Sequence, residues 1–209
     1  MLIVGAGGLA KEVLEIFHEK IMPGQLFFYD DVNADNKGLW YGQFSILKNM
    51  SEVKALFKND NSFVVAVGQP SARKMLHEKF IVAGGKPVSA ISSYATIGHY
   101  GTEVQAGTIV MAGTVITNDV KIGEGTLINP NCVISHDTTI GAFCEISPGV
   151  KITGACNIGE SASIGTGAII LPKVKLGNHV TVGAGAVVTK DVAEGLTVVG
   201  IPAKPLLKN

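Results

Sequence analysis

The stretch Ile122–Ile146 has the sequence IGEGTLINPNCVISHDTTIGAFCEI, in which isoleucine returns at every sixth position. The same six-residue spacing of aliphatic residues runs from Val104 to Val188, and no position of this series holds a charged or aromatic residue. A period of six fits neither an α-helix, which repeats near 3.6 residues, nor a simple strand, which repeats at two. It is typical of the hexapeptide repeats of a parallel β-helix.

A second track of small or β-branched residues lies four positions after each aliphatic residue. Its members are Thr108, Thr114, Val120, Thr126, Cys132, Thr138, Cys144, Val150, Cys156, Ala162, Ala168, Val174, Val180, Ala186 and Val192. We expect three short strands to form one triangular coil of about eighteen residues, and coils to stack because one coil cannot bury its own interior. All three cysteines of the chain fall on this track, which favours core packing over metal ligation or disulfides.

Glycines at one position of the repeat support this coil length. Gly123, Gly141, Gly159 and Gly177 each follow a core aliphatic residue and recur every eighteen positions. Glycine tolerates backbone φ angles that other residues avoid, and we expect such angles here. The β-helix is predicted to end after Val192, because a proline-rich exit cannot continue the ladder.

Residues 1–88 have the pattern of a small α/β domain that resembles half of a Rossmann-like dinucleotide fold. We predict strands at residues 2–4, 26–29, 62–67 and 86–89, and helices at residues 11–19, 51–57 with Ser51 as cap, and 71–80. The segment Gly5–Ala10 matches G-x-G-x-x-A, whose glycines let backbone N–H groups approach a phosphate at a helix N-terminus. Asp30 and Asp31 end the second strand, where an acid commonly binds a ribose hydroxyl. With a further glycine turn at Gly68, a nucleotide-type ligand is favoured over an α/β domain without a ligand.

The composition excludes some classes of function. The chain has 17 basic and 17 acidic residues, so its charge gives no case for nucleic acid binding. No apolar run reaches the length of a membrane span, and the start MLIVGAGGLA lacks the basic region and cleavage site of a signal peptide. We therefore expect a cytoplasmic protein without membrane insertion.

His136 is the candidate catalytic residue. It lies two positions after the core residue Ile134 and so points outward, and its neighbours eighteen positions away are Asn118 and Gly154. Glycine beside an outward histidine leaves room for a bound molecule. The adjacent Asp137 can set the imidazole tautomer and raise its basicity. A solvated surface histidine without a function is the alternative.

Two further observations concern ligands. The small residues at 165–166 and 183–185 lie one coil apart and predict a smooth groove for a long, thin cofactor arm. His99, His136 and His179 fall at unrelated positions of the coil. A metal-dependent hydratase on this fold needs converging histidines, so we expect no metal.

The whole chain resembles the bacterial sugar acyltransferase family that includes sialic acid O-acetyltransferases and N-acetyltransferases of nucleotide-linked 4-amino sugars. The matching segments are IVGAGGLAKEV (residues 3–13), FFYDD (27–31), VAVGQP (65–70), ISHDTTIG (134–141) and VVGIPAKP (198–205). The resemblance implies that the β-helix is left-handed and that the protein is a homotrimer with active sites between subunits. It divides the chain into a nucleotide-sugar-binding domain (1–88), a β-helix acyltransferase domain (89–193) and a tail that packs on the β-helix (194–209).

The resemblance also implies a reaction: direct transfer of an acetyl group from acetyl-CoA to the amino group of a UDP-, GDP- or TDP-linked amino sugar, without a metal. Transfer to a sugar hydroxyl, as in sialic acid O-acetyltransferases, is the alternative, and a non-catalytic nucleotide-binding β-helix is another. His136 is the expected general base and Asp137 its supporting acid. The implied acceptor-binding residues are Gly7, Gly8, Leu9, Asp30, Asp31, Gly68 and Asn129. The implied acyl-CoA-binding residues are Glu145, Gly154, Thr166 and Ala184.

The chain departs from the family pattern at two of these positions. Members often carry histidine in the first glycine turn, where this chain has Leu9. Many also carry histidine nine residues after the catalytic one, where this chain has Glu145. The identity of the acceptor and that of the acyl group therefore stay open.

Overall fold

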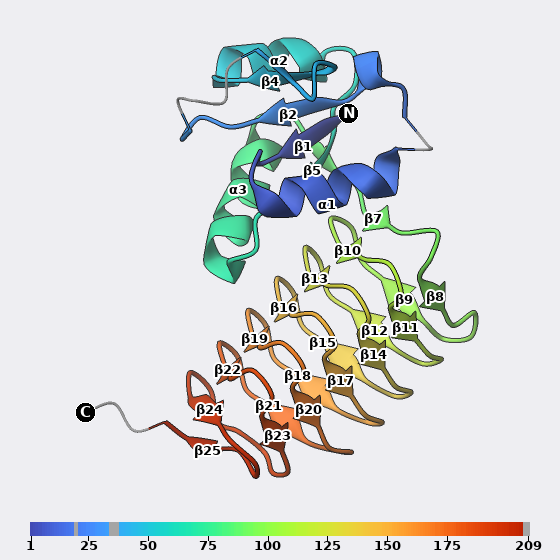
Figure 1. Ribbon diagram of the computed structural model, residues 1–209, viewed down its shortest axis with the longest axis vertical. Helices are drawn as coiled ribbons and strands as arrows, with labels where there is room; N and C mark the ends of the chain where they lie inside the picture. Colours follow the sequence, from blue (N-terminus) through green and yellow to red (C-terminus); the bar gives the residue numbers. More distant parts are fainter. Residues whose placement is uncertain (19–20, 34–37, 207–209) are drawn as a thin grey trace. The chain divides into compact units, whose positions relative to one another are not determined.

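A computed structural model describes residues 1–18, 21–33 and 38–206 of the 209-residue chain (Figure 1). The chain divides into two units, one ending at Ala90 and the other beginning at Ile91. The last position of the first predicted helix, Glu19, lies outside the described residues, as do residues 207–209 of the predicted tail. Among the described residues, no helix has both the length and the apolar character that crossing a membrane requires.

The first unit is built on a six-stranded sheet with the order β3-β4-β2-β1-β5-β6. Its strands are β1 (Leu2–Val4), β2 (Phe27–Tyr29), β3 (Leu39–Trp40), β4 (Phe44–Leu47), β5 (Ser62–Val65) and β6 (Lys86–Pro87). Its helices are α1 (Gly8–Phe17), the short 3-10 helix η1 (Pro23–Gln25), α2 (Met50–Phe57) and α3 (Pro70–Val82). Paired strands run parallel except β3, which is antiparallel to β4.

Apart from shifts of up to three residues at the ends of elements, the first unit differs from the sequence prediction mainly in two places. Strands β3 and β4 form a hairpin where no element was predicted, and the turn between them has positive φ at Tyr41 and Gly42. The cap of α2 is Asn49 instead of Ser51, because the Asn49 side chain accepts a hydrogen bond from the backbone N–H of Glu52 at 3.0 Å.

Both faces of this sheet are covered. On one face, alternate residues of β1, β2 and β5 pack in one cluster with Val53 of α2 and Phe80 of α3. The residues between them, Ile3, Phe28 and Val64, point to the opposite face and are also fully buried. The ends of the parallel strands are therefore the edge that is left for a ligand.

The second unit is a parallel β-helix, and each coil contributes one short strand to each of three sheets (Figure 1). Sheet I contains β7 (Ala90–Ile91), β10 (Ile109–Val110), β13 (Leu127–Ile128), β16 (Glu145–Ile146), β19 (Ser163–Ile164), β22 (Thr181–Val182), β24 (Thr197–Val199) and β25 (Lys204–Pro205). Sheet II contains β8 (Thr96–Ile97), β11 (Val115–Ile116), β14 (Val133–Ile134), β17 (Lys151–Ile152), β20 (Ile169–Ile170) and β23 (Val187–Val188). Sheet III contains β9 (Glu103–Val104), β12 (Lys121–Ile122), β15 (Thr139–Ile140), β18 (Asn157–Ile158) and β21 (Lys175–Leu176).

The two sequence tracks are confirmed as the core of the coils. From Val110 onward the residues of both tracks are buried. The polar members of the second track are satisfied by the next coil: Thr126 Oγ1 donates to the carbonyl oxygen of Gly141 at 2.8 Å. Cys144 Sγ makes the same contact with the carbonyl oxygen of Gly159 at 3.0 Å. A thiol thus replaces a hydroxyl in the same position of the repeat.

Gly123, Gly141, Gly159 and Gly177, the corner glycines, were expected to adopt φ angles that other residues avoid, and this expectation is wrong. Gly141 and its equivalents do not have positive φ; that conformation occurs at the third residue after each core aliphatic residue from Val104 to Val182. These residues are Gly107, Gly113, Asp119, Gly125, Asn131, Asp137, Phe143, Gly149, Ala155, Ser161, Gly167, Lys173, His179 and Gly185. At Gly141 a Cβ would lie 2.6 Å from the backbone nitrogen of Glu160 on the next coil. Glycine is therefore required there because successive coils approach too closely for a side chain.

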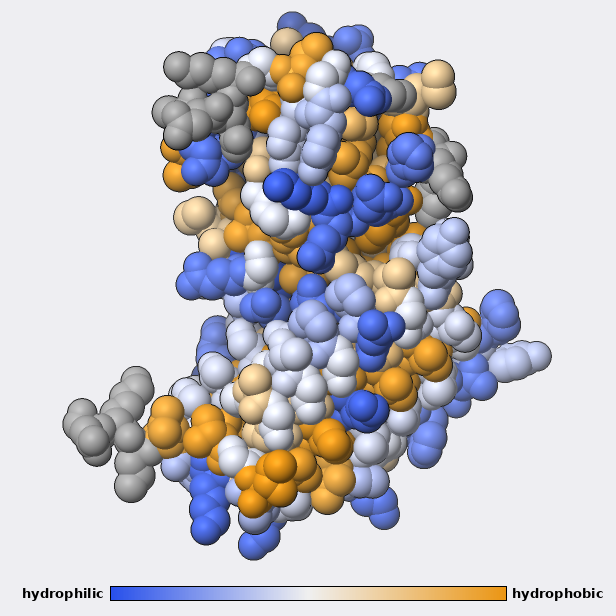
Figure 2. Space-filling view, in the orientation of Figure 1, coloured by the Kyte–Doolittle hydropathy of each residue, from blue (hydrophilic) through white to orange (hydrophobic). Residues whose placement is uncertain are grey.

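The ladder extends further than the sequence predicted. β24 pairs with β22 in parallel, and Val198 joins the core. The chain then reverses at Ile201–Pro202, and β25 pairs antiparallel with β24. The proline follows the last parallel strand, so it does not interrupt the ladder. Exposed apolar residues gather at this end of the β-helix (Figure 2), including Leu196, Ile201 and Leu206.

Replacement of Gly141 by alanine should destabilise the β-helix by about 1–3 kcal/mol, the range found for overpacked sites, because the Cβ would collide with the next coil. Thermal unfolding followed by circular dichroism measures this effect. Gly149→Asn is the matched control, since Gly149 has open space around its Cβ position and Asn131 already occupies the equivalent position with positive φ. A melting temperature of Gly141→Ala equal to that of Gly149→Asn would contradict the steric explanation.

The cysteines should be unreactive in the folded protein. Burial raises the pKa of the Cys132 thiol to about 11 and also raises the pKa of Cys156. Because the thiolate is the nucleophile, we expect no modification of these two residues by iodoacetamide at about pH 8, measured by mass spectrometry. All three cysteines should react in denaturant, and rapid modification of native Cys132 would show that the coils open.

Candidate active site

Three parallel strands bring the predicted acceptor-binding residues of the first unit to one edge of its sheet. Gly7, Gly8 and Leu9 follow β1, Asp30 and Asp31 follow β2, and Gly68 follows β5. β1 and β5 are neighbours, and the chain leaves β1 toward β2 on one side of the sheet and leaves β5 toward β6 on the other. Such a switch point is where open parallel sheets bind ligands.

The glycines of the first turn have different roles. Gly5 has φ 114°, and a Cβ there would lie 2.8 Å from the carbonyl oxygen of Ala66. Gly7 and Gly8 have no such constraint, because among the described residues no atom outside the adjacent residues and the backbone of α1 lies within 4 Å of a Cβ built on either. Packing within the described chain therefore does not require glycine at these two positions. The open space at the N-terminus of α1 suits an anionic group.

The two aspartates after β2 differ in their surroundings. Asp30 is 6% exposed and accepts hydrogen bonds from the backbone N–H and the side-chain amide of Asn33, at 3.0 and 2.8 Å. Asp31 accepts a hydrogen bond from the Tyr29 hydroxyl at 2.7 Å and lies 3.3 Å from Lys79 Nζ. The hydrogen bond from Tyr29 lowers the pKa of Asp31, which keeps it ionised. Asp30 thus shapes the turn, and Asp31 presents its charge at the surface.

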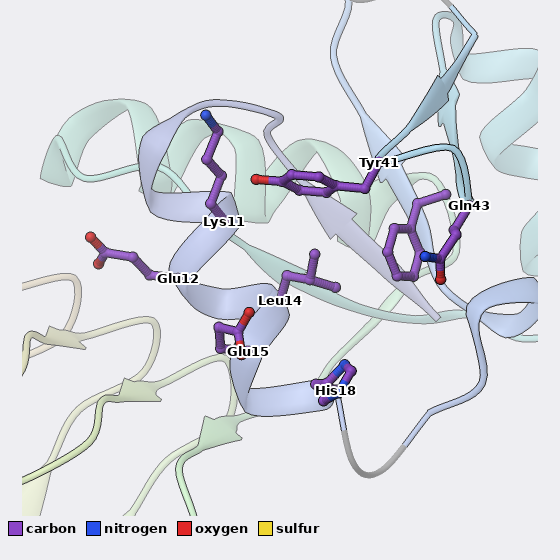
Figure 3. A pocket seen from close by; sticks show the side chains of 8 residues that line it. Lys11, Glu12, Leu14, Glu15, His18, Tyr41 and Gln43 are labelled. Atoms are coloured by element: carbon purple, nitrogen blue, oxygen red, sulfur yellow. The ribbon is translucent and has the colours of Figure 1, made fainter.

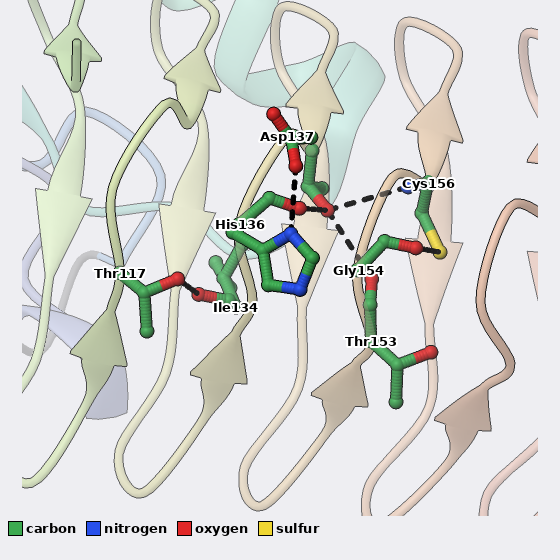
Figure 4. A network of polar contacts seen from close by, with 8 residues as sticks. Thr117, Ile134, His136, Asp137, Thr153, Gly154 and Cys156 are labelled. Carbon is green, nitrogen blue, oxygen red and sulfur yellow. Dashed lines mark hydrogen bonds and ion pairs between the residues drawn. The ribbon is translucent and has the colours of Figure 1, made fainter.

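His136 lies at the corner between sheets II and III, and its Nδ1 is 2.7 Å from Asp137 Oδ2 (Figure 4). Asp137 has φ 59°, a left-handed conformation that aspartate tolerates better than most residues. This conformation brings the carboxylate beside the preceding imidazole. With the Nδ1–H donated to the carboxylate, Nε2 keeps its lone pair. The two side chains are 67% and 62% exposed, so Nε2 is accessible as a proton acceptor.

Gly154 lies beside the imidazole on the next coil (Figure 4). A Cβ at Gly154 would lie 2.7 Å from Cε1 and 2.8 Å from Nε2 of His136. The ring therefore fills the space that the sequence suggested for a bound molecule. Hydrogen bonds also hold the His136 coil against the next coil. Thr138 Oγ1 donates to the carbonyl oxygen of Thr153 at 3.2 Å and accepts from the Cys156 N–H at 3.3 Å.

The remaining predicted residues do not meet His136 within one chain. Asn129, Thr166 and Ala184 lie at the corner between sheets I and II, and Glu145 lies within sheet I. Thr166 and Ala184 are on successive coils, joined by a hydrogen bond from the Gly185 N–H to the Thr166 carbonyl oxygen at 2.8 Å. Asn129 is 8% exposed, and its Nδ2 donates to the Ile146 carbonyl oxygen at 3.0 Å.

A separate groove of about 480 Å³ lies between α1 and the β3–β4 hairpin (Figure 3). It is lined by Lys11, Glu12, Leu14, Glu15, His18, Tyr41, Gln43 and Phe44, none of which belongs to the predicted site. Within the described ranges, no group of three or more histidine, cysteine, aspartate or glutamate side chains is arranged to hold a metal ion.

Both units of the chain match models of known protein families. Residues 1–80 match the PglD N-terminal domain, and residues 101–136, 119–154 and 155–190 match the bacterial transferase hexapeptide repeat. The acetyltransferase domain of PglB from Neisseria gonorrhoeae, solved in complex with acetyl coenzyme A, is 32% identical to the chain. The match covers 98% of each chain with a TM-score of 0.89. The chain belongs to the sugar acyltransferase family.

Two further structures similar to this sugar acyltransferase are 29% identical to it. A histidine mutant of perosamine N-acetyltransferase from Caulobacter crescentus, in complex with CoA and GDP-perosamine, matches with a TM-score of 0.87 over 99% of this chain and 96% of that one. WeeI from Acinetobacter baumannii matches with a TM-score of 0.88 over 98% of each chain. No curated protein matches significantly. The predicted enzyme class and fold, an α/β domain followed by a left-handed β-helix, are confirmed.

Gly154→Ala should reduce kcat/KM of this acyltransferase by up to about 10²-fold, the loss that a displacement of about 1 Å can cause, because the new methyl group would push the imidazole away. Steady-state kinetics measures the loss, and the melting temperature should change little. In the background of His136→Ala the same substitution should have no further effect, which tests the pair by a double-mutant cycle. Full activity of Gly154→Ala would show that the ring position is not critical.

Proposed function

We propose that the chain transfers an acetyl group from acetyl-CoA directly to the amino group of a nucleotide-linked amino sugar. The observation that carries the proposal is the His136–Asp137 pair, an exposed imidazole whose Nδ1 contacts a carboxylate while Nε2 stays accessible. The choice of substrates is supported by similar proteins whose structures contain acetyl coenzyme A or CoA with GDP-perosamine.

In the proposed mechanism Nε2 of His136 removes a proton from the acceptor amine while the nitrogen attacks the thioester carbonyl. A C–N bond forms, the C–S bond breaks, and the proton passes to the departing CoA sulfur. Asp137 holds the Nδ1–H and stabilises the imidazolium between the two proton transfers. A general base of this kind contributes about 10²–10⁴-fold, and the placement of the two substrates supplies much of the remainder.

Acetyl-CoA is proposed to bind where two copies of the chain meet. In sheet II, four of the six outward strand positions are apolar (Val115, Val133, Ile169 and Val187), and the other two are Thr96 and Lys151. The equivalent positions of sheet III carry Lys121, Thr139, Asn157 and Lys175. A second copy on sheet II would bring its corner with Thr166 and Ala184 toward His136 of the first. A homotrimer closes such a head-to-tail contact into a ring.

The other predicted residues take the following roles in this proposal. The nucleotide and its phosphates occupy the edge of the first unit that carries Gly7, Gly8, Leu9, Asp30, Asp31 and Gly68. Asn129 lies near the acceptor with its Oδ1, since its Nδ2 bonds the Ile146 carbonyl. Glu145 lies near the acyl-CoA, and Gly154 sets the position of the base. The cytoplasmic location stays a prediction.

The reaction is tested by release of free thiol from acetyl-CoA in the presence of UDP-, GDP- and TDP-linked amino sugars. We expect turnover with at least one of them and none with the matching sugar that carries a hydroxyl in place of the amine. Turnover of sialic acid instead, with no amino sugar accepted, would replace the proposal by O-acetylation. Tight nucleotide-sugar binding without any thiol release would remove the transferase function.

His136→Ala should fold normally and lose at least about 10²-fold in kcat, the lower range for a general base. The measurement is the same thiol-release assay, together with the melting temperature. His179→Ala is the control, because His179 is also an exposed corner histidine but lies at a different corner of the coil. Near-normal kcat/KM in the His136 variant would remove the mechanism.

A further inference from the structure

Arg73 of α3 is a buried charge that the proposed mechanism does not use. Its side chain is 1% exposed. A guanidinium keeps its charge under all physiological conditions, and its burial is costly unless its donors are satisfied. Because well-packed apolar residues often stabilise a core as well as buried ions do, a buried arginine is weak evidence for a role in stability alone. Its contacts indicate instead which backbone conformation it selects.

Two of its hydrogen bonds are with the turn that joins β5 to α3. Arg73 Nη1 donates to the carbonyl oxygen of Val67 at 2.9 Å and also to the carbonyl oxygen of Gly68. Two consecutive carbonyl groups after the end of β5 are therefore directed toward the guanidinium. Arginine suits this position because its donors lie in a rigid plane.

The same contacts decide where the N–H groups of the turn point. In a trans peptide unit the C=O and the N–H lie on opposite sides, so the N–H groups of Gly68 and Gln69 point away from Arg73. Neither group donates to an acceptor in the part of the chain that the structure describes. They lie immediately before Pro70, at the N-terminal end of α3, where the helix dipole is positive.

This turn lies beside the first glycine turn. A Cβ on Gly5 would contact the carbonyl oxygen of Ala66 at 2.8 Å, which shows how closely the segments after β1 and β5 approach. The two turns therefore flank the switch point of the sheet. Together they present backbone N–H groups to one side of this edge, and backbone N–H groups bind phosphate oxygens.

We propose that Arg73 is a positioning residue for the diphosphate of the nucleotide-linked sugar, which rests on the proposed function of the same edge. By holding the carbonyl groups of Val67 and Gly68 inward, it directs the N–H groups of Gly68 and Gln69 toward the phosphates. Arg73 does not touch the ligand itself.

The test compares Arg73→Met, which keeps the length of the side chain but removes every donor, with Arg73→Lys, which keeps the charge but not the planar fork. We expect the Kd for UDP or GDP, whichever the wild-type chain binds, and the KM for the nucleotide-linked sugar to rise about tenfold or more in Arg73→Met. That change corresponds to about 1.4 kcal/mol. A smaller rise is expected in Arg73→Lys, while the KM for acetyl-CoA and kcat at saturation stay within about twofold.

Val53→Ala is the control for a general loss of stability, because Val53 is fully buried in the same unit but lies on α2. It should lower the melting temperature without changing nucleotide affinity. Equal losses of affinity in Val53→Ala and Arg73→Met would overturn the proposal, as would wild-type affinity in a folded Arg73→Met. Should Arg73→Met fail to fold, Arg73→Lys decides, and an unchanged Kd there rejects the role.

Isothermal titration with the nucleoside diphosphate separates this proposal from the function on which it rests. A wild-type chain that binds neither UDP nor GDP and turns over no nucleotide sugar removes both. A wild-type chain that binds one of them, together with Arg73 variants that bind it equally well, removes only the role of Arg73.

Discussion

The structure depends on the backbone hydrogen bonds that join each coil of the β-helix to the next. Around the candidate base, the Ser135 N–H donates to the Ile152 carbonyl oxygen at 2.9 Å, and the Ala155 N–H donates to that of His136 at 2.8 Å. Such bonds align only when each coil has the same length and turns in the same way. The left-handed residue at every sixth position provides that uniform turn. Asp137 occupies one of these positions, so the residue that shapes the corner also contacts the imidazole.

The β-helix could be predicted from the sequence because the repeat leaves few alternatives. An aliphatic residue at every sixth position must be buried, and only a three-sided coil buries all of them. The hairpin β3–β4 could not be predicted in this way, because its strands have two and four residues and no alternation of burial. The position of the corner glycines was predicted correctly but their role was not. The approach of backbone atoms between coils is a distance that no local pattern records.

The candidate site likewise contains residues that the sequence pattern relates to one another and residues that only the folded structure brings together. His136 and Asp137 are adjacent in the chain, and Gly154 is one coil away, so the period alone relates all three. Lys79 and Arg73 act over contacts that the sequence does not reveal. Lys79 reaches Asp31 across 48 residues, and Arg73 reaches backbone carbonyls, which carry no residue identity. The sequence pattern therefore predicts neither the half-exposed Lys79 nor the buried Arg73 as part of the site.

The antiparallel strand at the end of sheet I has a consequence for the molecule in solution. Without it, β24 would present a row of unpaired N–H and C=O groups, which is a template for end-to-end polymerisation. β25 covers that row, and its own outer edge carries exposed Lys204 and Pro205, the second of which has no N–H to donate. The reversal after β24 therefore protects this edge of sheet I against pairing with a strand of another molecule.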